Sequence, residues 1–329
     1  MVIEAARLDF VELVIDAEQR IRGHVRETPL ERSNFLSQLT GADVYLKLES
    51  SQITGSFKLR GAMNKMLALS EKERANGVLT ASSGNHGTAC AYLMNYFKIP
   101  GTIFLPESVS PAKLEAIQSF GPDTELVPGD GIEAEKRARN LAASRGQVYV
   151  SPYNDPLIIG GQGTIGIELQ RQTENIDVIL VPVGGGGLVA GVGSYLKSRD
   201  RKVEIIGCQP ENSRVMYESI QAGEIIDMES KRTLSDGTAG GIDHDSITFD
   251  ACCNVISDWA LLSEQEIADA ILVTLERQHL MIEGASALTI AALMRSPQRF
   301  AGQTVVLLLT GSKLGLETLR NLLAATGHD

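Results

Sequence analysis

The stretch TGSFKLRGA, residues 54–62, places one lysine, Lys58, among small and apolar residues. Phe57 precedes this lysine, and a helix is expected to begin at about the same point. Taken alone, such a lysine is most simply a residue whose hydrocarbon stem packs against the aromatic ring. The alternative is a lysine that attacks a carbonyl group and forms a Schiff base. The loops elsewhere in the chain favour the second interpretation.

A run of four glycines, Gly184–Gly187, joins the apolar segment VILVPV to the helical segment LVAGVGSYLK. Consecutive glycines lose much conformational entropy on folding, so they are expected where the backbone must approach another group closely. Successive N–H groups at the start of a helix bind anions, and the helix dipole adds to the attraction. A flexible turn is the alternative, but the order strand, glycines, helix favours a phosphate site.

The same glycines also fit a dinucleotide-binding pattern, because Gly185, Gly187 and Ala190 match G-x-G-x-x-A. That pattern needs an acidic residue at the end of the next strand to bind a ribose. The corresponding segment, IIGCQP, has Cys208 and Gln209 at this position. The sequence therefore disfavours a nicotinamide cofactor.

Two further loops of small polar residues follow predicted strands. SSGNHG begins at Ser82, and its backbone and hydroxyl donors suit a carboxylate, while the amide of Asn85 suits a ring hydroxyl. The plainer interpretation is a turn in which Ser and Asn only cap a helix. The loop TGS, 310–312, offers the hydroxyl of Ser312 either to a helix or to a ligand. A phosphate site, a carboxylate site and a lysine nucleophile together indicate pyridoxal phosphate.

Buried strands alternate with helices along the chain, which predicts an α/β fold with parallel sheets. Ligands of such sheets bind beyond the carboxyl ends of the strands, where the three loops fall. Helix ends are marked by Ser110 before Pro111, by Gly146, and by Ser263 three residues before Glu266. The predicted strands are DVYLKLE (43–49), GVLTASS (77–83), GTIFLP (101–106), QVYVSP (147–152), DVILVPV (177–183), VEIIGCQ (203–209) and TVVLLLT (304–310).

The chain has 329 residues, enough for two lobes. Residues 75–155 contain three or four strand–helix units and are expected to form a small mobile domain, with 1–74 and 156–329 forming a large cofactor-binding domain. Lys and Arg number 30 and Asp and Glu 41, a net charge of −11, which disfavours nucleic acid and anionic membranes as partners.

Location and metal content can also be predicted. No apolar run reaches the length of a membrane span, and the acidic N-terminus does not resemble a signal peptide. The four cysteines lack a C-x-x-C spacing, and the five histidines are scattered. We therefore expect reduced thiols, a cytoplasmic location and no zinc site.

Four motifs together resemble the fold-type II pyridoxal-phosphate enzymes, in the branch of serine/threonine dehydratases and serine racemase. SFKLRGA, SSGNHG, GGGG after an apolar strand, and TGSKLG match in order and spacing over essentially the whole chain. The cysteine-synthase branch has a lysine motif like VKDR, whereas this chain has FKLR, which favours elimination over replacement. The chain ends 17 residues after Ser312, so it looks like a catabolic member without a regulatory extension, such as a dehydratase of hydroxyectoine utilisation.

The resemblance implies a role for each motif and a homodimeric assembly. Lys58 is expected to form the Schiff base with pyridoxal 5'-phosphate, and Ser83 to be the second catalytic residue. The residues expected to bind the cofactor are Phe57, Lys58, Asn85, Gly184, Gly185, Gly186, Gly187, Leu188, Glu283 and Ser312. Those expected to bind the substrate carboxylate are Ser82, Ser83, Gly84, Asn85 and His86.

Two positions depart from the family pattern. Relatives that a divalent cation activates carry an acid where this chain has Gln209, so no metal site is expected. Lys313 follows Ser312 where many relatives have glycine, which leaves the substrate open between threonine, serine, 3-hydroxyaspartate and an ectoine-derived compound. The expected reaction is β-elimination from a hydroxy amino acid to a 2-keto acid and ammonia. A racemase that uses Lys58 and Ser83, and a non-catalytic binding protein that retains the fold, are the alternatives.

Overall fold

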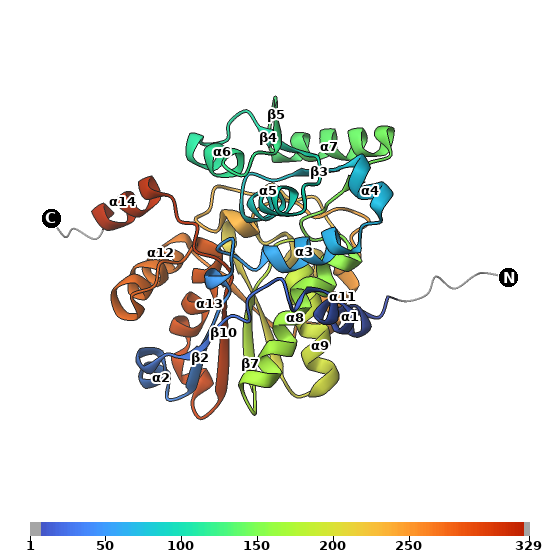
Figure 1. Ribbon diagram of the computed structural model, residues 1–329. Helices are drawn as coiled ribbons and strands as arrows, with labels where there is room; N and C mark the ends of the chain where they lie inside the picture. The colour runs from blue at the N-terminus through green and yellow to red at the C-terminus, as the bar shows by residue number, and fades with distance from the viewer. Residues whose placement is uncertain (1–7, 326–329) are drawn as a thin grey trace.

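The computed structural model describes residues 8–325 (Figure 1). Two separate sheets are flanked by helices, and the smaller sheet lies above the larger one in the view of Figure 1. The α/β fold class predicted from the sequence is confirmed.

The larger sheet has the strand order β1-β2-β10-β7-β8-β9. Its neighbouring strands are parallel except for the antiparallel pair of β1 and β2. β10 lies in the interior of the sheet, between β2 and β7, although it is the last of these strands along the chain. The strands are β1 (Leu30–Arg32), β2 (Asp43–Leu48), β7 (Val178–Pro182), β8 (Glu204–Pro210), β9 (Asp258–Leu262) and β10 (Thr304–Leu309).

The smaller sheet is parallel throughout, with the order β5-β4-β3-β6. It consists of β3 (Val78–Ala81), β4 (Gly101–Pro106), β5 (Asp123–Val127) and β6 (Val148–Tyr149). The seven predicted strands are present, although β6 is much shorter than predicted. β1, β5 and β9 were not predicted.

The helices that surround the sheets start and stop close to the predicted signals. Ser110 caps the helix that begins with Pro111, Ser263 and Glu266 form a capping box, and Gly146 adopts the left-handed conformation after its helix. The helices are α1 (Phe10–Ile21), α2 (Asn34–Thr40), α3 (Lys58–Ala68), α4 (Glu71–Asn76), α5 (Asn85–Phe97), α6 (Pro111–Gln118), α7 (Gly131–Arg145), α8 (Pro156–Gln172), α9 (Gly187–Arg199), α10 (Val215–Ala222), α11 (Thr248–Val255), α12 (Glu264–Val273), α13 (Gly284–Arg295) and α14 (Leu316–Ala325). Short helical turns are η1 (Glu49–Ser51), η2 (Glu211–Ser213), η3 (Asp236–Thr238), η4 (Thr274–Gln278) and η5 (Pro297–Phe300).

Both faces of the larger sheet are buried, which explains the continuous apolar runs of its inner strands. Leu180 and Leu307 point into a core shared with α12 and α13. Ile179 and Leu308, their neighbours in sequence, point into a second core shared with α8 and α9. Side chains alternate between the two faces of a strand, so helices on both sides hold the inner strands rigidly in register.

Helix α3 lies between the two sheets in Figure 1 and joins their cores. Leu59, Met63 and Met66 of this helix pack with Leu93 of α5 and Val78 of β3. The N-terminal end of α3, at Lys58, lies near the carboxyl end of β10. Within residues 8–325, no helix is long and apolar enough to cross a membrane.

Candidate active site

Backbone hydrogen bonds fix the position of Lys58 at the carboxyl end of β10. The loop before α3 pairs with the loop after β10, because Phe57 N donates to Thr310 O at 3.1 Å and Ser312 N donates to Gly55 O at 3.2 Å. Ser56 and Gly311 form an isolated bridge between the same two segments. The lysine motif and the loop at residues 310–312 are therefore paired side by side, although more than 250 residues separate them in sequence.

The amine of Lys58 lies in a partly buried position, hydrogen-bonded to the backbone. Nζ donates to Pro152 O at 2.8 Å and lies 5.1 Å from the centre of the Phe57 ring. Burial lowers the pKa of Lys58 to about 8, and the nearby Glu283 and Cys90 oppose this shift only in part. The amine itself, rather than the hydrocarbon stem alone, lies near the aromatic ring, in a partly buried position. A lysine whose pKa is this low carries a substantial neutral fraction near neutral pH, as a nucleophile or base requires.

The four glycines lie between β7 and α9, as predicted. Gly186 has φ +83° and would strain any other residue type, while a Cβ placed on Gly185 would lie 2.5 Å from the ring of Tyr153. Thr248 Oγ1, at the start of α11, donates to Gly185 O at 2.7 Å and holds the loop in place. Leu188, the second residue of α9, is almost fully buried. A bare backbone at the start of a 13-residue helix fits a phosphate group.

The second loop lies directly before α5. Ser82 Oγ accepts a hydrogen bond from Gly84 N at 3.3 Å within the loop, but no side chain of residues 8–325 caps α5, so the interpretation of Ser82 and Asn85 as helix caps is not supported. Ser83 and Gly84 follow Ser82 and are partly exposed, and α5 begins at Asn85. His86 is buried, with Nε2 3.0 Å from Val150 O. Burial and the nearby Lys58 lower its pKa to about 3, so this imidazole is neutral at physiological pH.

Asn85 and Glu283 meet across the two sheets, although 198 residues separate them. Asn85 Nδ2 lies 3.0 Å and 2.8 Å from the two carboxylate oxygens of Glu283. Thr310 Oγ1 also donates to Glu283 Oε1, at 3.2 Å. Asn85 Oδ1 is buried and has no hydrogen-bond partner. This orphaned acceptor is available to a ligand that carries a donor, such as a hydroxyl group.

Burial raises the pKa of Glu283, and its hydrogen bonds with Asn85 and Thr310 counteract this shift in part. Its charge acts on Lys58 and also on Lys313, whose pKa burial lowers to about 8. Glu283 is therefore the anionic group that both of these lysines share.

The third loop differs from the sequence prediction in one respect. Helix α14 begins at Leu316, four residues beyond Ser312, so Ser312 is too far away to cap it. Of the two roles that the sequence left open for its hydroxyl, capping is wrong. The loop stays close to Lys58 through the hydrogen bond between Ser312 N and Gly55 O.

Gln209 is buried at the end of β8, and its amide is used by the protein. Nε2 donates to Val183 O at 3.1 Å, and Oε1 accepts from Tyr217 N at 2.9 Å. No group of three or more His, Cys, Asp or Glu side chains suited to a metal ion occurs between residues 8 and 325.

Tyr153 was not identified from the sequence. Its ring lies against Gly185, and its hydroxyl accepts a hydrogen bond from Asp243 N at 2.8 Å. Asp243 is in turn paired with Arg139 of α7 at 2.5 Å. The position of Tyr153 four residues after β6, at the same end of the sheet as the other loops, was the available signal.

The residues present fit a phosphorylated aldehyde that bears a ring hydroxyl. The glycine loop presents bare backbone with no room for a Cβ at Gly185 or Gly186, Asn85 has an unused acceptor, and Lys58 has a lowered pKa. Comparison with known proteins agrees with this chemistry. Residues 21–311 match the family described as "Pyridoxal-phosphate dependent enzyme", and the chain belongs to this family.

Within that family, proteins similar to this chain include dehydratases and racemases. The L-threonine ammonia-lyase of Thermotoga maritima is 37% identical over 313 residues, which cover 95% of this chain and 78% of the relative. The processed form of threonine deaminase isoform 2 from Solanum lycopersicum has a TM-score of 0.90 and 30% identity, with coverage of 97% and 93%. Maize serine racemase has a TM-score of 0.89 and 28% identity, with coverage of 97% and 98%. The resemblance to fold-type II dehydratases is therefore confirmed, and with it the pyridoxal-phosphate cofactor.

Proposed function

We propose that this protein converts a β-hydroxy amino acid of the threonine or serine type into a 2-keto acid and ammonia. The observation that carries the proposal is the amine of Lys58, which is partly buried, has a lowered pKa and donates a hydrogen bond to Pro152 O. The similarity to L-threonine ammonia-lyase over 95% of the chain supports elimination as the reaction.

Lys58 is the general base in this proposal. Bound pyridoxal phosphate supplies the electron sink that stabilises negative charge at the substrate Cα. The neutral amine of Lys58 removes the Cα proton, and the β-hydroxyl leaves as water after it takes up a proton. The enamine that remains tautomerises and hydrolyses with one water molecule, giving the 2-keto acid and ammonia. With a pKa of about 8, roughly a quarter of the Lys58 amine is neutral at pH 7.5.

The other predicted site residues orient the reacting groups. The backbone N–H groups of Gly184–Gly187 hold the phosphate, with Phe57 and Leu188 packing nearby. Asn85 binds the ring hydroxyl through Oδ1, and Glu283 fixes the amide so that this oxygen faces the ring. Ser312 meets the ring nitrogen. A neutral hydroxyl does not hold a proton on that nitrogen as a carboxylate would, which limits the electron sink and favours elimination over transamination.

The loop after β3 takes the substrate carboxylate. Ser82, Ser83, Gly84, Asn85 and His86 lie at the start of α5, whose free N–H groups and dipole attract an anion. The neutral imidazole of His86 adds no charge there. Ser83 is the second catalytic residue, on the side of the substrate opposite Lys58.

We also propose the larger organisation of the enzyme. Residues 75–155, with the smaller sheet, move as a mobile domain against 1–74 and 156–329. Three ion pairs join these parts: Lys65 with Asp155 at 2.6 Å, Lys113 with Asp236 at 2.8 Å, and Arg139 with Asp243. The protein acts as a cytoplasmic homodimer on a small-molecule substrate.

A screen of hydroxy amino acids tests the proposal. Purified protein is incubated with L-threonine, L-serine, 3-hydroxyaspartate and an ectoine-derived hydroxy compound, and keto acid and ammonia are measured. Release from at least one substrate, abolished in Lys58→Ala, is the expected result. Inversion of serine without keto acid would favour the racemase. A colourless protein with no borohydride-reducible label on Lys58 would favour a non-catalytic binding protein.

A further inference from the structure

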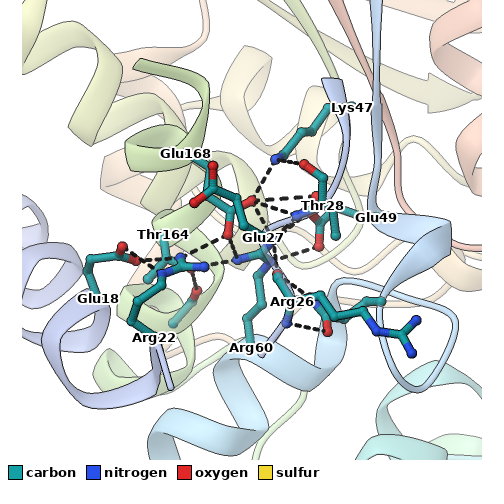
Figure 2. Close-up of polar contacts among 12 residues, drawn as sticks. Glu18, Arg22, Arg26, Glu27, Thr28, Lys47, Glu49, Arg60, Thr164 and Glu168 are labelled. Atoms are coloured by element: carbon teal, nitrogen blue, oxygen red, sulfur yellow. Dashed lines mark hydrogen bonds and ion pairs between the residues drawn. The ribbon is translucent and has the colours of Figure 1, made fainter. Parts of the chain in front are cut away.

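Four charged side chains are fully buried together beside the start of α3. They are Arg60 of α3, Lys47 of β2, Glu49 of η1 and Glu168 of α8, with two positive and two negative charges. Figure 2 shows them close together, and Arg22, which follows α1, joins them by pairing with Glu168 at 2.8 Å and with Glu18 of α1. No sequence pattern indicated this cluster, because charged residues are rarely buried.

Arg60 is the hub of the cluster. Its Nε and Nη2 lie 2.8 Å from the two oxygens of Glu49. Its Nη1 and Nη2 lie 2.7 Å and 2.8 Å from the two oxygens of Glu168. Nη1 also donates to Thr164 Oγ1 at 3.2 Å. The planar guanidinium thus binds two carboxylates in bidentate fashion, which fixes its orientation as well as its position.

Lys47 belongs to the same cluster and contacts α8 and the segment before β1, but not α3. Its Nζ donates to Glu168 Oε2 at 2.6 Å, to Thr28 O at 2.8 Å and to Gln172 Oε1 at 2.9 Å. Burial opposes the ionisation of Glu168, but Arg60 and Lys47 together outweigh it and lower the pKa of Glu168 to about 2. The carboxylate therefore stays charged, and the cluster stays paired, at any pH at which the enzyme works.

Such a cluster is an inefficient way to gain stability. The desolvation of buried charges offsets most of their attraction, and apolar residues of similar volume often stabilise a fold as well or better. Buried ionic groups do, however, select one geometry, since removing any partner leaves an uncompensated charge. Arg60 lies two residues after Lys58, so the geometry at issue is that of the first turn of α3.

The first turn of α3 has no side-chain cap of its own. It is held instead by α8: Gln162 Oε1 accepts from Gly61 N at 3.2 Å, and a Cβ on Gly161 would lie only 2.6 Å from Gly61 Cα. Residues 58 and 60 are two positions apart, which is roughly 200° around a helix. Lys58 and Arg60 therefore project to nearly opposite sides, and rotation of the turn would displace both.

We propose that Arg60 is a positioning residue for Lys58: by binding Glu49 and Glu168 it fixes the rotation of the first turn of α3 and holds the amine at Pro152 O. The inference rests on the proposed role of Lys58 as the reactive amine. If Arg60 is loosened, the amine leaves its partly buried site and more water reaches it. Arg60 itself touches neither substrate nor cofactor.

The test compares Arg60→Lys with the matched control Lys47→Met. Arg60→Lys removes the guanidinium that binds Glu168, and Lys47→Met removes the ammonium group that binds the same carboxylate. Only Arg60 lies on α3, whereas Lys47 lies on β2. Full-length protein, freed of cofactor, is acylated at a series of pH values with an amine reagent, and peptide mapping gives the pH midpoint of Lys58 alone. Melting temperatures are recorded in parallel.

We expect both variants to melt at lower temperature, and the Lys58 midpoint to rise by about one unit towards its ordinary value in Arg60→Lys only. That rise corresponds to a fall of about eightfold in the neutral fraction at pH 7.5. Equal midpoints in the wild type and Arg60→Lys, or equal shifts in the two variants, would show that the cluster only stabilises the fold.

If Arg60→Lys does not fold, Glu49→Gln takes its place, because it removes one counter-charge and keeps the shape. A smaller rise of the midpoint is then expected, and no rise overturns the inference. The proposed function is judged separately by borohydride labelling of the wild type. A label on Lys58 with an unchanged midpoint in the variants would refute only the role of Arg60.

Discussion

Asn85 and Glu283 form a bidentate contact between the start of α5 and the start of α13. Nδ2 of Asn85 donates to the carboxylate, while the carbonyl oxygen of the same amide is buried without a partner. A buried acceptor without a donor is costly, so the protein alone leaves this hydrogen bond open for a ligand. Among nearby charged groups, the carboxylate of Glu283 raises the pKa of Lys58 most. Glu283 therefore both orients Asn85 and influences the pKa of Lys58.

Replacement of Glu283 by glutamine should lower the pKa of Lys58 below about 8. The negative charge of Glu283 raises that pKa against the effect of burial, and a neutral amide cannot do so. The acylation midpoint of Lys58 measures the shift. Thr310→Val is the matched control, because it removes a hydrogen bond to Glu283 but no charge. A midpoint that moves upward in Glu283→Gln would contradict the assignment.

The wild-type lysine should control how fast the cofactor attaches. Only the neutral amine attacks the aldehyde, and its fraction grows with pH until the folded-state pKa, about 8, is passed. The rate of attachment of added pyridoxal phosphate to the cofactor-free protein should therefore rise up to about pH 8 and then level off. Stopped-flow absorbance gives the profile. A rate that keeps rising to pH 10 would mean that the amine is exposed to water.

Gly185→Val should weaken cofactor binding by at least about tenfold, equivalent to roughly 1.4 kcal/mol. The new Cβ would lie 2.5 Å from the Tyr153 ring, so the glycine loop or the ring would have to shift. Spectroscopic titration with pyridoxal phosphate measures the affinity. Gly131→Val is a suitable control, because a Cβ there meets nothing within 4 Å. Unchanged affinity in a folded Gly185→Val protein would refute the phosphate site.

Ser83→Ala should abolish inversion of configuration, or turnover of D-substrates, more than elimination from L-substrates. A second group on the face opposite Lys58 is needed only when the proton is exchanged from that face. Chiral chromatography and keto-acid release measure the two reactions. Ser82→Ala serves as the comparison, since Ser82 Oγ already accepts a hydrogen bond from Gly84 N. Equal losses with both enantiomers would assign Ser83 to substrate orientation.

Activity and melting temperature should change little between a chelator and millimolar Mg²⁺ or Ca²⁺. Hard cations prefer several anionic oxygens, and Gln209 offers a neutral carbonyl that already accepts from Tyr217 N. Turnover and thermal denaturation in both conditions are the measurements. Several-fold activation, or a saturable rise in melting temperature that Gln209→Ala removes, would demonstrate a cation site.

The sequence predicted the inner strands of both sheets but missed β1, β5 and β9. Each of these strands lies at the edge of a sheet, where one side has no neighbour. In β5, Asp123 and Glu125 are mixed with apolar residues, and most of the strand is not fully buried. Continuous apolar runs reveal strands that are covered on both faces, and edge strands do not need them.

The candidate site was predictable where chemistry is tied to local sequence. Glycines between a strand and a helix, or a lysine beside an aromatic residue, carry their signal within a few positions. The cluster around Arg60 carries none, because Lys47, Glu49 and Glu168 become neighbours only in the folded chain. Ser312 was misjudged as a possible cap because an irregular stretch separates β10 from α14.

The place of β10 in the larger sheet has a consequence for the synthesis of the chain. The strands on either side of it end at Leu48 and Pro182, whereas β10 begins at Thr304. During translation, one edge of β2 and one edge of β7 therefore stay unpaired until β10 has been synthesised. Unpaired strand edges promote aggregation. Lys58 gains its neighbours Thr310 and Ser312 at the same late moment, so a nascent chain cannot capture the cofactor before its fold is nearly complete.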